Sequence, residues 1–429
     1  MFQERLAAAP DGAGSLEIGL VSSLHEFPPG EWEELTRGLG LFLSRPYLLA
    51  IEEATATRPM YLTARDGGGQ LVGGLPCYLW DGSPDPGMDT YEPYRMGARW
   101  RLSRRAREAL WRPTLVVGSR SGYQTPLAVR PGRHLESGWV VARLAEEVAQ
   151  LAQRLGAQSV GWMWLRPTAA AALLPSLRRS EDLVLAGPSC SIPISWSSFD
   201  GYLSHLTAQR RRSARREREL FFASGLTIGQ ARLSDCLEEV APLGASLQRR
   251  YGHQVSAAEL AQELSCQARH LDAQSVVLLC RRGDRLVAFT LLYRWDDTLY
   301  ARLAGFDYDQ VAGSAAYFNL AFYQPIQLAI ETGATNLHLG MASWRAKALR
   351  GAEFEPQWIV VWPPPRTSGA WRRAAERESA SGGPAGWWAS TFPAQVDPNT
   401  DWRWTVEGLR RGPDEGGHAV GAAWEALES

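Results

Sequence analysis

The fold of this chain is decided by residues 303–315, which read LAGFDYDQVAGSA. The stretch joins an expected strand, 299–305, to an expected long helix, 314–332, which ends at Gly333. Small residues allow a tight turn where the helix begins. The free N–H groups and the dipole of a helix N-terminus bind a pyrophosphate or another anion. The stretch therefore predicts an anion-binding strand–turn–helix unit, with an ordinary helix start capped by Ser314 as the alternative.

The residues around this unit read as a mixed domain of helices and strands. Helical patterns occupy 199–222, 234–251 and 257–271, and strand patterns occupy 226–231, 275–281, 285–295, 336–340 and 355–362. Short turns at 283–284 and 296–297 join the three central strands as a meander. We therefore expect a mostly antiparallel sheet flanked by helices.

The first half of the chain repeats this succession less clearly. We expect strands at 15–21, 60–65, 70–80, 111–118 and 158–165 and helices at 31–39 and 138–155. The sequence thus predicts an α/β (α+β) fold of two tandem domains, 1–195 and 196–365. Residues 366–429 are rich in Gly, Pro, Ser and Ala and are expected to form a flexible tail, although its six tryptophans suit docking on the body or on a partner.

The composition excludes several classes of function. Apolar residues make up 45% of the chain and the formal net charge is −1, so a basic surface must be local. The five cysteines and seven histidines show no metal-ligand spacing, and no permanently bound cofactor or metal is expected. No window suits a membrane span and the start, MFQER, is not a secretory leader, so the expected location is the cytoplasm.

Residues 310–315 and their surroundings resemble the GNAT superfamily of acyltransferases. The turn resembles the signature Q/R-x-x-G-x-G/A, and residues 198–362 resemble the Fem-like and "predicted N-acyltransferase" branch. The matching stretches are 202–206, 210–212, 250–252, 303–307, 316–320, 330–333, 339–340 and 347–351. The resemblance spans about 15–362 and implies two tandem GNAT-like domains, the first of them degenerate. It also implies amide formation from an acyl thioester or an aminoacyl-tRNA. A long helical hairpin often found in peptidoglycan-bridge Fem proteins has no counterpart here, which puts a cell-wall substrate in doubt.

The candidate catalytic residues surround the turn. Asp307 is the first choice as proton acceptor, before Asp309 and Glu331, with a solvated turn carboxylate as the alternative. Tyr317 suits protonation of a leaving group, although an aromatic at helical spacing is also an ordinary core residue. Lys347 is the one lysine among 45 basic residues. Its ammonium is a compact positive charge that suits binding of a phosphate or a carboxylate.

The candidate binding residues fall into two groups. The donor is expected at the turn and at an arginine-rich helix. The alternative for that helix is an ordinary solvated face with partners such as Arg215 and Glu219. The expected donor-binding residues are Gln310, Gly313, Ser314, Ala315, Arg210, Arg211, Arg212 and Arg215. The substrate is expected at Asn319, Tyr323, Arg345 and Arg350.

We therefore expect an N-acyltransferase that forms an amide on a small-molecule or peptide amine. Aminoacyl-tRNA is the expected donor because six arginines within 210–218 exceed what the phosphates of coenzyme A require. An acyl-CoA or carrier-protein thioester is the close alternative because the turn suits a pyrophosphate. A non-catalytic nucleic-acid or partner-binding module is the alternative from another class. The acceptor, the acyl group and the oligomeric state are not specified by the sequence.

Overall fold

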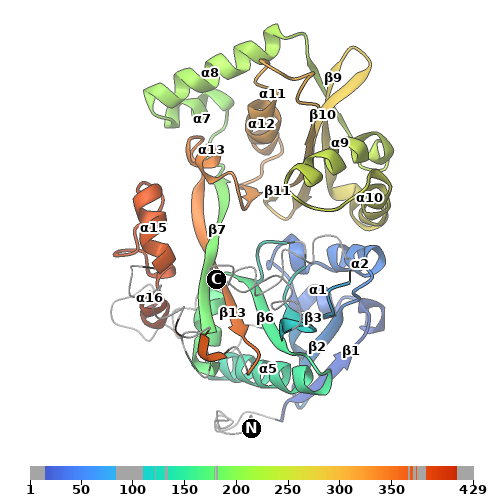
Figure 1. The fold of residues 1–429 in the computed structure, drawn as a ribbon, viewed down its shortest axis with the longest axis vertical. Helices are drawn as coiled ribbons and strands as arrows, with labels where there is room; N and C mark the ends of the chain where they lie inside the picture. Colours follow the sequence, from blue (N-terminus) through green and yellow to red (C-terminus); the bar gives the residue numbers. More distant parts are fainter. Residues whose placement is uncertain are drawn as a thin grey trace. The chain divides into compact units, whose positions relative to one another are not determined.

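The chain forms two compact units, which we describe separately (Figure 1). The computed structural model describes residues 15–83, 110–120, 122–130, 134–177, 179, 182–365, 368–370, 373 and 383–412. Unit 1 comprises Met1–Leu48, Ala56–Pro188 and Glu355–Ser429, and unit 2 comprises Leu49–Thr55 and Ser189–Phe354.

Unit 2 contains a sheet with the strand order β8-β9-β10-β11-β12-β7. Its strands are β8 (Thr227–Ala231), β9 (Ser275–Arg282), β10 (Arg285–Trp295), β11 (Thr298–Phe306), β12 (Asn336–Gly340) and the second part of β7 (Leu183–Pro193). Its helices are α7 (Phe199–His205), α8 (Ala208–Ala223), α9 (Leu237–Arg250), α10 (Ala257–Leu271), α11 (Ala316–Phe318), α12 (Gln324–Glu331) and α13 (Trp344–Ala348), with a 3-10 turn η6 (Asp272–Gln274). A π-helical turn η7 (Asn319–Tyr323) joins α11 to α12.

Unit 1 contains the strand order β1-β2-β3-β4-β6-β13-β7. Its strands are β1 (Glu17–Val21), β2 (Met60–Arg65), β3 (Leu71–Trp80), β4 (Thr114–Val117), β5 (Ala128–Val129), β6 (Ser159–Leu165), β13 (Glu353–Trp362) and the first part of β7. Its helical elements are η1 (Leu24–Glu26), α1 (Glu31–Leu35), η2 (Leu41–Leu43), α5 (His134–Arg154), α6 (Pro167–Leu173), η4 (Leu174–Ser176), α15 (Gly383–Thr391), η8 (Trp402–Trp404) and α16 (Val406–Arg411). Helix α2 (Arg45–Ala54) begins in unit 1 and ends in unit 2.

The two sheets have the same pairing pattern. In unit 1, β1 to β4 pair antiparallel in sequence order, β4 pairs parallel with β6, and β6 pairs antiparallel with β13. In unit 2, β8 to β11 pair antiparallel, β11 pairs parallel with β12, and β12 pairs antiparallel with β7. In each unit helical residues connect the two parallel strands, α5 in unit 1 and α11 to α12 in unit 2. The predicted fold of two tandem domains of one kind, each a mostly antiparallel sheet with helices, is thus confirmed.

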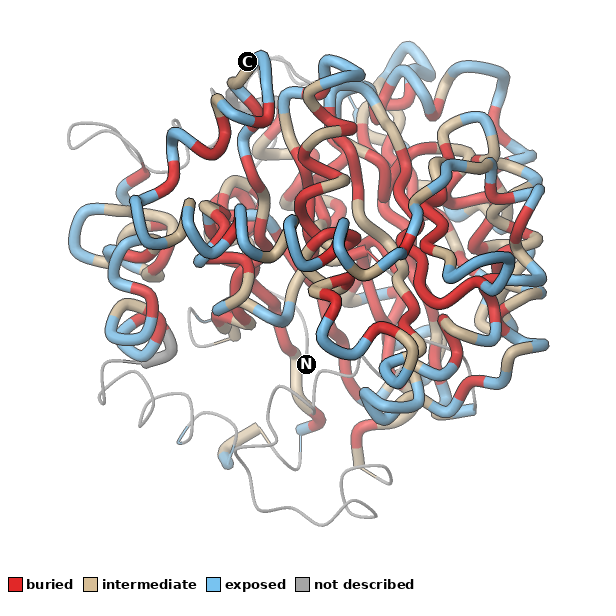
Figure 2. The backbone as a smooth tube through the Cα atoms, turned by 90° about the horizontal axis from the view of Figure 1, so that it is seen from above, coloured by how far each residue is buried: buried red, intermediate tan, exposed pale blue. Residues whose placement is uncertain are grey.

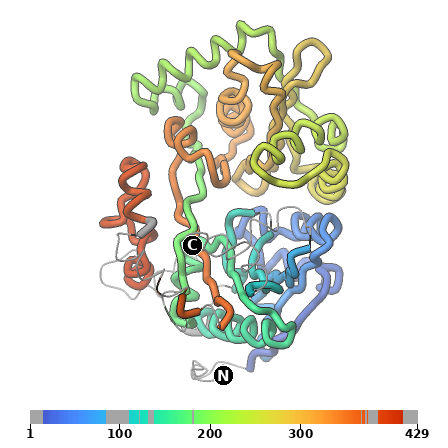
Figure 3. Tube along the Cα trace, viewed as in Figure 1, coloured from blue at the N-terminus to red at the C-terminus, as the bar shows by residue number. Residues whose placement is uncertain are grey.

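Each sheet receives one strand from the other half of the sequence. Strand β7 continues from Pro188 into unit 2, where Cys190 to Pro193 pair with β12. Strand β13 leaves unit 2 at Phe354, and its residues Trp358 to Trp362 pair with β6 of unit 1. Figure 3 shows β7 in green and β13 in orange as two crossing segments of the chain. The described residues from 355 onward, which we expected to divide between the second domain and a tail, belong to unit 1.

Three stretches differ from the sequence-based expectation. The expected helix 199–222 is two helices, because Leu206 is extended (ψ 151°) and the hydroxyl of Thr207 caps α8 by accepting from the Arg210 N–H. The expected helix 314–332 begins at Ala316 and contains the π turn. In the expected flexible tail, α15, η8 and α16 are helical, and Trp404 and Leu409 are buried. Trp371 and Trp424 lie outside the described residues.

Each unit has its own core. Figure 2 shows red, buried backbone along the inner strands and pale blue, exposed backbone along the outer turns. Large buried side chains of unit 1 include Trp32, Trp111, Trp162 and Trp404, and those of unit 2 include Tyr202, Phe221, Tyr293 and Tyr323. Burial of this much aromatic surface is the main source of stability that the fold offers.

Candidate active site

Strands β11 and β12 diverge in unit 2 and leave one edge of β11 open. They pair only at Thr298–Tyr300 with Asn336–His338. Beyond these positions β11 continues through residues 301–306, and the described strands show no further pairing with β12. The Asp307 N–H donates to Val287 O of β10 (2.8 Å), so alternation along the strand directs the N–H groups of Ala304 and Phe306 to the opposite, open edge. These N–H groups suit an oxyanion.

The turn after β11 is shaped by Asp307. Its backbone carbonyl accepts the N–H groups of Gln310 (3.1 Å) and Val311 (3.0 Å), and its carboxylate accepts from Gln310 (3.3 Å) and from the Arg285 guanidinium (2.8 Å). These contacts occupy the carboxylate within the turn. The expected role of Asp307 as the base therefore stays a prediction for which this geometry gives no support.

The predicted donor turn, 310–315, presents free backbone N–H groups. Within the described residues the N–H groups of Ala312, Gly313 and Ala315 have no acceptor. Gly313 (φ 71°) and Ala315 (φ 55°) lie in the left-handed region, and Ser314 is buried with its hydroxyl donating to Val311 O (2.6 Å). Successive free N–H groups at the start of a helix form a site for an anion.

Tyr317 connects the two diverging strands. Tyr317 lies on the helix that follows β11, and the side chain of Ser343, which follows β12, interacts with its phenol and opposes the rise of its pKa. Burial, more than any other cause, raises the pKa of Tyr317, so the phenol stays protonated at neutral pH. The aromatic rings of Phe306 (5.6 Å) and Phe322 (6.0 Å between centroids) surround it. A buried phenol at this place can donate a proton to a leaving oxygen or sulfur.

Lys347 supports the segment after β12. Its side chain is buried, and its ammonium donates to Leu339 O (2.7 Å), Gly340 O (2.9 Å) and Met341 O (2.8 Å). Burial lowers the pKa of Lys347 to about 8, whereas three carbonyl acceptors favour the ammonium. Because its three protons are all used, the lysine is placed to hold the backbone. Its expected catalytic role stays a prediction.

The held segment is strained. Gly340 (φ 66°), Ala342 (φ 64°) and Ser343 (φ 50°) all lie in the left-handed region, which is costly for the latter two. The Lys347 ammonium binds the carbonyls at the start of this segment, and the Ser343 side chain at its end interacts electrostatically with the Tyr317 phenol. The strain therefore places a polar side chain at the open edge.

The predicted substrate-binding residues Asn319, Tyr323 and Arg350 converge on one residue that the sequence analysis missed, Glu217. Glu217 of α8 accepts from the Tyr323 hydroxyl in a short hydrogen bond and from Arg350 (2.7 Å). The Asn319 amide donates to Glu217 O (3.1 Å) and to Ala315 O (3.0 Å). Burial raises the pKa of Tyr323, which keeps it a donor to Glu217. The network holds α8 against the π turn. Its only sign in the sequence is one acidic residue, Glu217, among the arginines of α8.

Some of the predicted donor-binding arginines on α8 contact the protein, and others are exposed to solvent. Arg211 is partly buried and donates to Leu206 O (3.3 Å), Arg210 is half-buried, and Arg218 packs its guanidinium 4.0 Å over the Phe199 ring. Arg212, Arg215 and Arg216 are exposed and form no ion pair within the described residues, and the alternative pairing of Arg215 with Glu219 is not found there. Arg345 of α13 is exposed. The exposed arginines form a cationic face, which we call the α8 arginine face: Arg212, Arg215 and Arg216.

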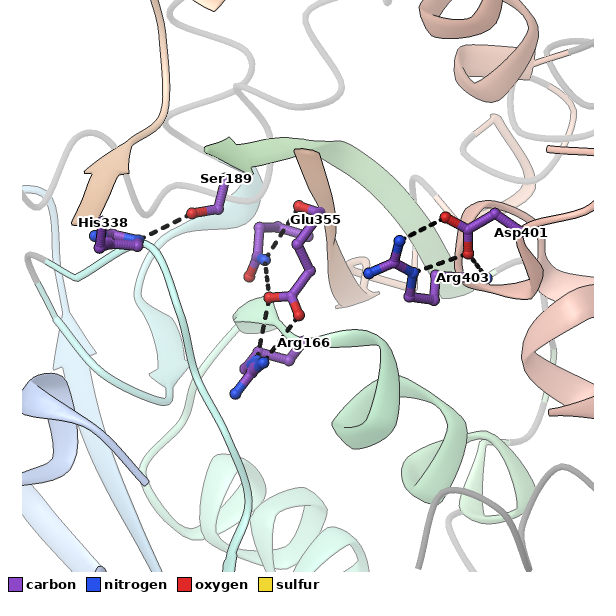
Figure 4. Close-up of polar contacts among 7 residues, drawn as sticks. Arg166, Ser189, His338, Glu355, Asp401 and Arg403 are labelled. Carbon is purple, nitrogen blue, oxygen red and sulfur yellow. Dashed lines mark hydrogen bonds and ion pairs between the residues drawn. The ribbon is translucent and has the colours of Figure 1, made fainter. Parts of the chain in front are cut away.

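Figure 4 shows polar contacts that hold strands in place. In unit 2, His338 of β12 is buried and its Nε2 contacts Ser189 Oγ of β7 (2.9 Å). In unit 1, Arg166 after β6 forms a two-point contact with Glu355 of β13 (2.9 and 3.1 Å). Among the described residues no group of three His, Cys, Asp or Glu could hold a metal ion. No described helix has both the length and the apolar character needed to cross a bilayer.

The sequence of this chain matches a known protein family. The family model FemAB-like, described as peptidoglycan biosynthesis/recognition, matches residues 23–364. The chain belongs to the FemAB-like family. A FemAB-like chain with this double GNAT fold is an acyl- or aminoacyltransferase, so the expectation of an enzyme is confirmed over the alternative of a non-catalytic module.

The chain is also similar to several solved structures. The chain is similar to the crystal structure of FemX, at 10% identity over 83% of this chain and 100% of that chain, with a TM-score of 0.50. It is also similar to a tandem GNAT protein from the clavulanic acid biosynthesis pathway, at 12% identity over 81% and 98% of the two chains (TM-score 0.43). The C-terminal domain of a putative lysylphosphatidylglycerol synthetase from Agrobacterium fabrum matches at 16% identity over 62% and 82% (TM-score 0.43). No curated protein sequence matches the chain.

Proposed function

We propose that this FemAB-like enzyme transfers an aminoacyl group from aminoacyl-tRNA to an amine of a peptide or small molecule in the cytoplasm. The observation that carries the proposal is the open edge of β11 beside the free N–H groups of Ala312, Gly313 and Ala315. This arrangement offers a bound donor both an anion site and an oxyanion site.

The reaction needs few groups. The acceptor amine attacks the ester carbonyl, a C–N bond forms, and the carbonyl oxygen becomes an oxyanion that the N–H groups of Ala304 and Phe306 can stabilise. The C–O bond to the ribose then breaks, and the leaving oxygen takes the proton of Tyr317. The amine proton passes to solvent, and solvent returns a proton to the Tyr317 phenolate. Holding amine and ester together supplies much of the remaining acceleration.

The α8 arginine face supports tRNA as the donor. Arg212, Arg215 and Arg216 are exposed without a carboxylate partner in the described residues, so their charge is available to phosphates. Each phosphate contact releases counterions and makes binding depend on salt. The turn at 310–315 favours the alternative, an acyl-CoA or carrier-protein thioester, since its N–H groups suit a pyrophosphate without any arginine face.

Binding of charged tRNA and of acetyl-CoA at low and moderate salt tests the donor. We expect salt-sensitive tRNA binding, and we expect Arg212→Glu with Arg215→Glu to weaken it at least tenfold and to lower the salt dependence by about one unit of slope per lost contact. Arg37→Glu with Arg58→Glu is the matched control, because both arginines are exposed and belong to unit 1. Binding of acetyl-CoA alone, with both double variants unchanged, would assign the thioester instead.

A further inference from the structure

Two exposed tyrosines lie beside the donor turn, and no step of the reaction uses them. Tyr251 ends α9 with a relative exposure of 65%, and Tyr308 within the turn is 39% exposed. Burial raises the pKa of Tyr308 and of Tyr317, and the Tyr251 hydroxyl adds to both shifts. Tyr251 directly follows Arg250, whose guanidinium lies over the Tyr308 ring, and the Phe306 ring at the end of β11 lies near the rings of both Tyr308 (6.0 Å) and Tyr317 (5.6 Å).

Guanidinium groups accompany the two exposed rings. The Arg250 guanidinium lies 4.4 Å over the Tyr308 ring. Arg282 donates to Gln310 O (2.8 Å) in the turn and to Ser224 O (3.2 Å). Here an aromatic ring and a stacked guanidinium lie next to free N–H groups. This combination favours a ligand that has both a planar ring system and an anionic group.

We propose that Tyr251, Tyr308 and Arg250 form a platform on which the donor's adenine base stacks. The inference rests on the proposed function, and both candidate donors satisfy it because the 3′ end of tRNA and coenzyme A each carry an adenosine. The base extends the Tyr308–Arg250 stack on the guanidinium, and the neighbouring phosphate reaches the free N–H groups of Ala312, Gly313 and Ala315.

The position of the platform distinguishes the two donors chemically. In aminoacyl-tRNA the ester is on the ribose of the terminal adenosine, so a base stacked near Tyr317 brings the ester to that phenol. In acyl-CoA a pantetheine arm separates adenosine and thioester, and that arm would have to follow the open edge of β11 toward Ala304. The rings of Tyr308 and Tyr317 both lie near Phe306 (6.0 and 5.6 Å), and this proximity suits the shorter connection.

Binding by fluorescence anisotropy tests the platform with two pairs of probes. The first pair is an uncharged acceptor-stem RNA hairpin ending in CCA and the same hairpin ending in CCC; the second is coenzyme A and 4′-phosphopantetheine, measured as competitors. We expect Tyr251→Leu with Tyr308→Leu to weaken the CCA hairpin roughly tenfold to a hundredfold and to leave the CCC hairpin unchanged. Tyr251→Phe with Tyr308→Phe keeps the rings and should bind within about twofold of wild type.

The outcomes separate the platform from the proposed function. Trp387→Leu removes an equally exposed ring from unit 1 and serves as the control. Equal binding of CCA and CCC hairpins, or unchanged binding by the leucine variant, would overturn the platform while salt-sensitive RNA binding still supported a tRNA donor. Loss confined to coenzyme A would assign the adenosine to that donor and overturn the tRNA source. Absence of binding by every probe would overturn both the platform and the proposed donors.

Discussion

Unit 1 and unit 2 contain the same succession of paired strands, yet among the described residues the parallel strands diverge to leave an open edge only in unit 2. In unit 1 the parallel strands β4 and β6 pair at Thr114–Val117 with Ser159–Trp162. Thr125 then bridges Leu165, and its N–H donates to Trp164 O (2.6 Å). The corresponding strands of unit 2, β11 and β12, pair at three positions and diverge without such a bridge in the described residues.

The difference shows that the fold alone does not make the site. Thr125 occupies in unit 1 the place that β11 leaves open in unit 2, and its side chain packs within 2.6 Å of where a Cβ on Gly118 would be. Beyond the bridge, Arg166 and Glu355 join β6 to β13. Unit 2 instead has the turn with free N–H groups, the Tyr317–Ser343 pair and Lys347.

The largest expected effect is on the support of the open edge. Lys347→Met should lower the free energy of unfolding by about 3 kcal/mol, because three inward carbonyls lose their donor. Lys347→Arg should also destabilise unit 2 and impair turnover, because the planar fork replaces a compact charge in a buried space. Urea denaturation measures both variants.

Arg166→Met provides the comparison in unit 1. Its ion pair with Glu355 is partly exposed (side chains 46% and 22%), so its loss should cost at most about 1 kcal/mol. Equal losses from Lys347→Met and Arg166→Met would show that the two strand ends are held alike.

Tyr317→Phe should lower the transfer rate about a hundredfold, which corresponds to about 2.7 kcal/mol, because the leaving group loses its proton donor. Tyr123→Phe is the matched change in unit 1, where the ring packs against Trp164 (5.5 Å), and it should leave the rate unchanged. Single-turnover kinetics separates this effect from donor binding. A Tyr317→Phe enzyme as fast as wild type would remove Tyr317 from the mechanism.

Gly305→Ala should destabilise unit 2 by about 2 kcal/mol. An added Cβ would lie 2.5 Å from the Phe289 ring and 2.7 Å from the backbone of Leu243 in α9, so helix and strand would have to separate. In unit 1 the counterpart β4 reads TLVV and needs no such residue. The Cβ that Gly229→Ala adds has no neighbour within 4 Å, so this variant should keep the melting temperature of the wild type. An unchanged melting temperature for Gly305→Ala would show that α9 can move to make room for the added Cβ.

The smallest expected effect is a dependence of stability on pH. The folded pKa of Lys347, about 8, lies below its ordinary value, so the folded state disfavours the charge and the penalty is complete below pH 8. As pH rises above 8 the folded protein releases the proton first and stability increases. Wild type should therefore gain about 1 kcal/mol between pH 7 and 9 relative to Lys347→Met, which lacks the group. Parallel curves for the two proteins would contradict this.

Local patterns in the sequence predicted much of the fold and little of the site's connections. The meander 275–305 and the turn at 310–315 were readable because alternation and small residues are local signals. Strand β7 was missed because its sequence LVLAGPSCSIP is interrupted by Gly187 and Pro188 and its partners are distant. The residues chosen around 317–350 do gather in unit 2, but the role of Glu217 depends on contacts more than 100 positions away.

The exchange of β7 and β13 imposes an order on synthesis of the chain. The ribosome releases β6 early, but β13, its antiparallel partner, emerges only after the whole of unit 2. Unit 2, in contrast, has all of its strands once residue 340 has been made. Co-translational folding should therefore complete the unit with the open edge first, and the N-terminal unit waits with an unsatisfied strand until its last partner arrives.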